Sequence, residues 1–240
     1  MNFLWGWKAE AQSRGGFSQR ATQRESSRWT LQEWLEQRDR SRMMDLWLSM
    51  NSPSPFEFML GLSYLSTTTK VDTPAFEKSF NHAGAEVRAY AQFVGLTAEY
   101  ENNAEENYHD FTGMLNLRLF GNSLQNSSLT LHGGQRSRGL VVNGTAATLR
   151  NVFVQGSLQL YFSKYFGLDG FYRHYSPDKN ADLGVTVDGN LSEVGLFIDF
   201  QAVRVFGAWY QDVQKNKNDT TGAESATSRT GVKSGLRIYY

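Results

Sequence analysis

The sequence predicts an all-β protein, a transmembrane antiparallel up-and-down barrel of about ten strands that follows an N-terminal helical segment. From residue 55 onward, segment after segment alternates between large apolar residues and polar residues, as strands with one apolar face do. The apolar face carries large side chains on nearly every segment, and a small barrel could not hold them all inside. Several segments have about ten residues, the length that a tilted strand needs to cross a membrane.

The composition excludes several classes of protein. The chain has 240 residues, with 24 lysines and arginines against 24 aspartates and glutamates, so no excess positive charge favours nucleic acid. It has no cysteine, which excludes a disulfide scaffold and thiolate metal sites. The histidines show no metal-ligand spacing, and we expect neither a metal nor a cofactor. No run approaches the roughly 20 apolar residues of a membrane helix.

The chain divides into three parts. Residues 1–26 are polar and rich in Gly, Ser, Gln and Arg, which predicts a flexible segment. Within 27–54, Thr30 and Glu33 form a capping box, and apolar residues recur at helical spacing. We expect one or two amphipathic periplasmic helices there. Residues 55–240 form the predicted barrel.

Tryptophan is concentrated before the barrel, at Trp5, Trp7, Trp29, Trp34 and Trp47. This residue is enriched where a helix meets a membrane interface or a partner. We expect the helical segment to lie on the inner leaflet, to cover the barrel mouth, or to bind a periplasmic partner through Trp34 and Trp47. The alternative is that it packs against the base of the barrel.

The predicted connectors alternate in length. Short ones are expected at 94–95, 121–127, 164–165 and 201–202, and long polar ones at 67–80, 102–109, 138–148, 177–190 and 214–230. Short turns on one rim and long loops on the other are typical of outer-membrane barrels. An even number of antiparallel strands places both ends of the barrel on the short-turn rim.

The polar face of the predicted strands carries charged residues, namely Glu57, Glu86, Arg88, Glu99, Arg118, Asp169, Arg173, Glu193, Asp199, Arg204, Lys233 and Arg237. A soluble barrel, such as a lipocalin-like carrier, would expose these charges and bury the aliphatic face. In a membrane each charge facing lipid near the midplane costs about 2–4 kcal/mol, so the charges must face the lumen. Acids and bases are balanced, and we expect a paired network that closes the lumen; the alternative is a small pore.

The final residues KSGLRIYY resemble the C-terminal assembly signal of outer-membrane barrel proteins. Lys233, Gly235, Ile238 and Tyr240 occupy the polar, glycine, hydrophobic and terminal aromatic places, although this family usually ends in Phe. The resemblance implies insertion by the outer-membrane assembly machinery, contact with outer-membrane lipid and lipopolysaccharide, and a location in a Gram-negative outer membrane. The N-terminus lacks a basic region before its short apolar stretch, so we expect that a signal peptide has been removed.

One constellation suggests an enzyme instead. His174 and Ser176, followed by Glu193 on the next predicted strand, resemble the His-x-Ser element and catalytic Glu of outer-membrane lipid A deacylases. Pro177 replaces the family's Asn, however, and the spacing to Glu193 is long. His174 also fits an interfacial histidine of an aromatic belt, and His132 is expected to be a hydrogen-bond partner inside the lumen. The sequence therefore favours a non-enzymatic barrel with a structural or partner-binding role over a lipid-modifying enzyme or a pore.

Overall fold

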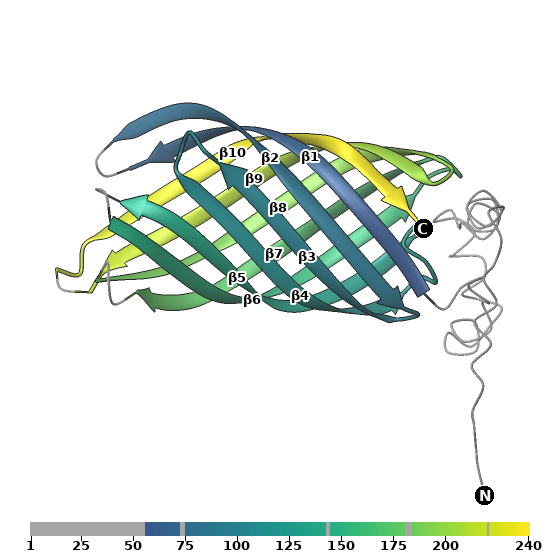
Figure 1. Cartoon of the computed structure of the whole chain (residues 1–240), viewed down its shortest axis with the longest axis horizontal. Coiled ribbons are helices and arrows are strands. Elements are labelled where there is room, and N and C mark those ends of the chain that lie inside the picture. Colours follow the sequence, from purple (N-terminus) through teal and green to yellow (C-terminus); the bar gives the residue numbers. More distant parts are fainter. Residues whose placement is uncertain (1–55, 73–74, 143–144, 181–183, 220) are drawn as a thin grey trace, which may run out of the picture.

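The computed structural model describes residues 56–240 except 73–74, 143–144, 181–183 and 220. The described chain forms ten antiparallel strands that close into one barrel, each paired with its neighbours in the sequence and β1 with β10 (Figure 1). This confirms the predicted fold class and strand number. The predicted segments 1–26 and 27–54, including Trp34 and Trp47, lie outside the described residues.

The strands are β1 (Phe56–Val71), β2 (Phe76–Ala91), β3 (Val94–Asn103), β4 (Tyr108–Phe120), β5 (Ser128–Val142), β6 (Thr145–Tyr161), β7 (Phe166–Asn180), β8 (Val185–Phe200), β9 (Val203–Asn218) and β10 (Glu224–Tyr239). Within the described part of the chain, no helix has the length and hydrophobicity needed to cross a bilayer.

The outside of the barrel is apolar over a broad band. On β1 the outward Leu60 is 48% exposed, whereas the inward Met59 beside it is 2% exposed. The same alternation runs around the barrel, and no second layer of the described structure covers the band. An apolar surface of this extent on a closed barrel faces lipid, which confirms the predicted orientation of the two faces.

Aromatic side chains border the apolar band on both sides. The border nearer the chain end includes Phe162, Tyr165, Phe166, Phe200 and Tyr240, and the opposite border includes Tyr64, Tyr100, Phe111, Tyr172 and Trp209. Beyond Tyr64, the outward residues of β1 are Ser66, Thr68 and Lys70. The band therefore ends at Tyr64, while the strand continues to Val71.

The barrel is taller than its apolar band. The 16 residues of β1 span about 53 Å along the strand, at ~3.3 Å per residue. A tilt of ~40° leaves about 40 Å of height, against an apolar band of ~25 Å in such barrels. The end opposite the chain terminus, which we call the far rim, therefore projects out of the membrane into water.

The prediction of five long loops is largely wrong, because strands occupy most of the residues concerned. These residues are 67–80, 102–109, 138–148, 177–190 and 214–230. On β1, for example, Thr67 and Thr69 are buried inside the barrel at 2% exposure each, and their neighbours point outward. Outside the membrane the outward face is also polar, so the contrast between faces disappears although the backbone pairing continues.

The turn predicted at 94–95 is also misplaced by two residues. Val94 and Gly95 belong to β3, and the turn lies at Gln92 and Phe93, where Gln92 has a φ of 59°. A Cβ at Gly95 would come 2.7 Å from the Tyr90 ring, so this glycine serves close packing inside the barrel rather than the turn.

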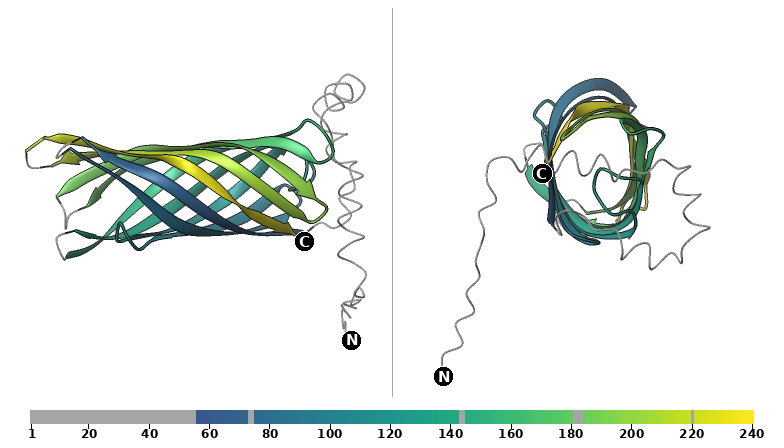
Figure 2. Two further views of the ribbon diagram at one scale, coloured as in Figure 1. Left: turned by 90° about the horizontal axis from the view of Figure 1, so that it is seen from above. Right: turned by 90° about the vertical axis from the view of Figure 1, so that its right-hand side faces the viewer.

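The barrel closes at the rim that holds the chain end, which we call the terminal rim. The Tyr240 amide donates to the Phe58 carbonyl at 2.8 Å, and the Phe58 amide donates to the Tyr240 carbonyl at 2.9 Å. Both ends of the barrel thus lie on one rim, with the turns that precede β3, β7 and β9 (Figures 1 and 2). This confirms the expectation from an even strand count.

The edge of the apolar band makes a first prediction. Leu60→Arg places a charge at the middle of the band on β1 and should lower the free energy of unfolding by about 2–4 kcal/mol. Ser66→Arg, six residues along the same outward face, should lower it by no more than about 1 kcal/mol. Urea unfolding in phospholipid vesicles measures both, and equal costs would contradict the assigned membrane edge.

Candidate functional site

The lumen is the candidate site, because all of the predicted lumen charges lie at inward strand positions. Glu57, Arg118, Arg173, Glu193, Asp199, Arg204 and Arg237 are buried. The side chains of Glu86, Arg88, Glu99, Asp169 and Lys233 are 15–24% exposed. Their partners decide whether the lumen is open or closed.

A loop fills the lumen at the terminal rim. The connection 121–127 between β4 and β5 folds into the barrel mouth (Figure 2, right). Its Gln125 is fully buried. The Leu124 amide donates to Glu57, and Gln125 Nε2 donates to the Gln201 carbonyl at 2.7 Å. The loop is therefore bound to the wall on two sides.

A fully buried ion pair lies next to this loop. Arg204 Nε donates to Asp199 Oδ1 at 2.7 Å, and both residues are 0% exposed. The Arg204 guanidinium also donates to Tyr161 Oη at 2.6 Å and to Gln159 Oε1 at 2.7 Å. It lies 3.7 Å from the centre of the Phe197 ring. The guanidinium is thus surrounded by acceptors and an aromatic face, which offsets the cost of removing it from water.

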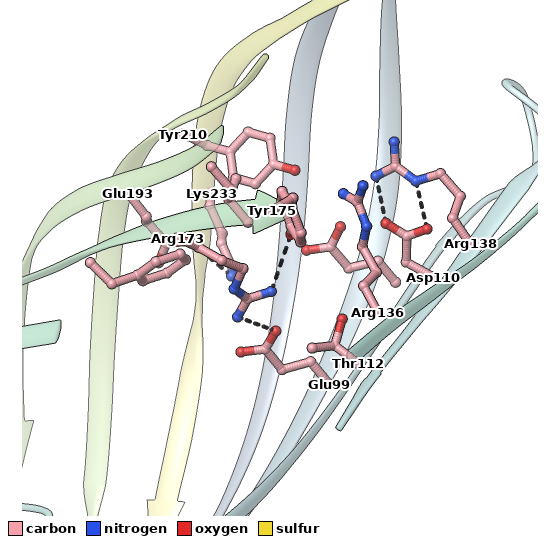
Figure 3. Close-up of a pocket in the computed structure, with 13 residues that line it drawn as sticks. Glu99, Asp110, Thr112, Arg136, Arg138, Arg173, Tyr175, Glu193, Tyr210 and Lys233 are labelled. Atoms are coloured by element: carbon pink, nitrogen blue, oxygen red, sulfur yellow. Dashed lines mark hydrogen bonds and ion pairs between the residues drawn. The ribbon is translucent and has the colours of Figure 1, made fainter. Parts of the chain in front are cut away.

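Ion pairs also cross the middle of the lumen. Arg173 on β7 donates to Glu99 on β3 at 2.8 Å (Figure 3). Its Nε donates to Gln155 at 2.6 Å. Arg237 on β10 donates to Asp169 on β7 at 2.6 Å. Lys233 on β10 also pairs with Glu193 on β8, whereas Arg88 pairs with Glu86 along β2 without crossing the lumen.

A third network, toward the far rim, was missed by the sequence reasoning. Arg138 donates to Asp110 at 2.6 and 2.5 Å (Figure 3). It also donates to Asp212 at 3.3 Å. Arg229 donates to Glu106 at 2.7 Å. Most of these residues lie in segments that were expected to be loops. Arg138 lies an even number of residues from the inward His132. Extending the two-residue alternation of this strand beyond its hydrophobic stretch would therefore predict that Arg138 points into the lumen.

The enzyme-like constellation is not formed. His174 points outward, where its Nδ1 lies 2.7 Å from Asn190 Oδ1, and Ser176 is exposed. Glu193 points inward, paired with Lys233 at 3.0 Å. The barrel wall separates the histidine from the glutamate, so the resemblance to lipid A deacylases does not extend to the geometry. Among the described residues, no group of His, Asp and Glu could hold a metal ion.

The four residues of the C-terminal motif occupy distinct environments. Lys233 faces the lumen, whereas Ile238 and Tyr240 point outward and are 46% and 48% exposed. A Cβ at Gly235 would come 2.9 Å from the Phe206 ring and still closer to the Leu62 carbonyl. Glycine is thus required at this position by the packing of the folded barrel. A role of the motif in assembly stays a prediction.

No family model and no curated protein matches the chain. Three solved structures with a similar fold are the outer membrane protease OmpT of Escherichia coli, Ail of Yersinia pestis and OprG of Pseudomonas aeruginosa. OmpT is 11% identical, with 77% of this chain and 96% of OmpT covered and a TM-score of 0.43. Ail is 10% identical, with 76% of this chain and 98% of Ail covered and a TM-score of 0.24. OprG is 10% identical, with 77% of this chain and 95% of OprG covered and a TM-score of 0.25. These likenesses are to outer-membrane β-barrels and extend to the fold alone.

The buried pair near the terminal rim makes a second prediction. Asp199→Ala leaves Arg204 buried without its carboxylate and should lower the free energy of unfolding by about 3–5 kcal/mol. The matched control is Glu77→Ala, which removes an exposed ion pair with Lys70 and should cost about 1 kcal/mol or less. Denaturant unfolding in detergent micelles or vesicles measures both. A cost for Asp199→Ala as small as that of the control would contradict the role of the pair.

Proposed function

We propose that this chain is a closed, non-conducting barrel of a Gram-negative outer membrane with a structural or partner-binding role. The observation that carries the proposal is a set of ion pairs between segments that are not adjacent in the barrel wall. These pairs are Arg118 with Glu57, Arg173 with Glu99, Arg138 with Asp212 and Arg229 with Glu106. Each pair spans part of the lumen, and together they occur from the terminal rim to the far rim.

Opening a path for ions through this interior would be costly. A continuous column of water requires that the pairs at every level separate and that the loop 121–127 leave the mouth. Each separation gives up at least one charge-assisted hydrogen bond, with a net contribution of about 1.5–3 kcal/mol. Separating the four pairs together would cost roughly 6–12 kcal/mol, which is comparable to the total stability of a typical domain, about 5–15 kcal/mol. A stable open state is therefore not expected.

If the lumen is closed, a binding partner in the surrounding water can contact the protein at the far rim, which projects out of the membrane. Among the described residues of this rim, three ion pairs join exposed charges, namely Lys70 with Glu77, Lys179 with Asp219 and Lys217 with Glu224. Within the hairpins β1–β2 and β9–β10 the strands remain hydrogen-bonded almost to the turns, whereas the pairing of β6 with β7 ends at Phe153 and Tyr175. The far rim is therefore a polar collar built of strand hairpins. Such a surface supports a structural or binding role better than transport.

The third prediction concerns conductance. The protein refolded in detergent and inserted into a planar bilayer should give no stepwise current, because no continuous water path crosses the lumen. Insertion is verified separately by heat-modifiable mobility of the reconstituted protein, and a general porin in the same bilayer is the positive control. Stepwise openings that scale with the amount of this protein would overturn the proposal.

A further inference from the structure

Four polar side chains form a directed chain of hydrogen bonds inside the barrel. They come from adjacent strands β3, β4, β5 and β6. Asn116 Nδ2 donates to Thr97 Oγ1 at 2.7 Å, and Asn116 Oδ1 lies 2.7 Å from His132 Nδ1. His132 Nε2 in turn lies 2.7 Å from Ser157 Oγ. The imidazole is thus placed between an amide and a hydroxyl.

The first bond of the chain determines the direction of the others. Because the Asn116 amide nitrogen donates to Thr97, its oxygen faces His132 and can only accept. His132 therefore carries its proton on Nδ1, and its Nε2 lone pair faces the Ser157 hydroxyl. A hydroxyl, an imidazole that can take its proton and a group that orients the imidazole are the parts of a serine nucleophile.

Ser157 also lines a small cavity inside the lumen. Arg118 lines the same cavity, and its Nη2 is buried without a hydrogen-bond partner among the described residues. A buried donor with no partner calls for an explanation, and an oxygen that develops negative charge is a suitable acceptor. Leu124 of the loop 121–127 forms part of the cavity wall, so the loop separates the cavity from the terminal rim.

We propose that Ser157 is an activated nucleophile for a small carboxylic ester, with His132 as general base and Asn116 as positioning residue. Ser157 Oγ bonds to the ester carbonyl carbon while its proton passes to His132 Nε2. The carbonyl oxygen becomes an oxyanion that accepts from Arg118. The ester C–O bond then breaks, and the leaving alkoxide takes the proton from His132. Water repeats these steps on the acyl-serine, releasing the carboxylic acid and restoring Ser157.

This activity goes beyond the proposed closed barrel and is compatible with it. The cavity lies within the lumen, and a molecule can enter it when the loop 121–127 moves aside without any path opening through the pairs further along. A positive bilayer recording would therefore overturn the closed lumen and leave Ser157 unaffected, whereas the labelling test below concerns Ser157 alone.

The test uses the full chain refolded in detergent and phenylmethanesulfonyl fluoride, which forms an Oγ–S bond with an activated serine and loses fluoride. We expect an adduct on Ser157 by peptide mass spectrometry and none in Ser157→Ala. His132→Gln should slow labelling by about 10²–10⁴-fold, the usual contribution of a general base. Ser192→Ala, which removes an outward serine of β8, should label at the wild-type rate.

Three further variants keep the proposal falsifiable, namely a glycine replacement in the loop 121–127, Asn116→Asp and Asn116→Ala. Replacement of 122–126 by five glycines removes the wall of the cavity and should speed the labelling of Ser157. Asn116→Asp should retain labelling and shift its pH profile upward, because a carboxylate stabilises the protonated imidazole. Heat-modifiable mobility verifies folding of every variant. The proposal is overturned if Ser157 stays unlabelled in both the wild type and the glycine variant, or if folded His132→Gln or Asn116→Ala labels as fast as the wild type.

Discussion

Pairing of guanidinium groups with carboxylates inside the barrel is the constraint on which the rest of the structure depends. A barrel in lipid must turn its apolar side chains outward, and the alternation of a strand then forces every second residue inward. In this chain many inward residues are arginines and acids. An unpaired charge there would cost several kcal/mol, so the fold is stable only if the ten strands bring each guanidinium to a partner.

The same constraint explains where the networks lie and why the lumen closes. A pair between neighbouring strands, such as Arg204 with Asp199, satisfies the charges but leaves space in the lumen. Pairs such as Arg173 with Glu99 satisfy the charges and occupy that space. The loop 121–127 completes the closure at the terminal rim, where Glu57 accepts a backbone amide of the loop as well as Arg118. The pairing of the buried charges therefore also closes the lumen.

The sequence determined the faces of the strands far better than their ends. Leu60 and Met59 could be assigned to opposite faces because a bilayer makes the two faces differ in polarity. Beyond Tyr64 this contrast is absent, so the sequence pattern predicts a loop at Thr67 and Thr69 although they continue β1. The strand register explains the remaining omissions. Alternation within one segment does not specify which residues of distant segments lie opposite each other. That register determines the partners of Arg138, the burial of Gln125 and the alignment of Asn116, His132 and Ser157.

A double-mutant cycle across the lumen tests the central role of charge pairing most directly. Glu99→Gln, Arg173→Gln and the double variant would be compared with the wild type by the free energy of unfolding in vesicles. The two side chains come from strands on different sides of the lumen and share a 2.8 Å bond, so the account predicts a coupling of roughly 1–3 kcal/mol. Additive effects of the two substitutions, within about 0.3 kcal/mol, would contradict the account.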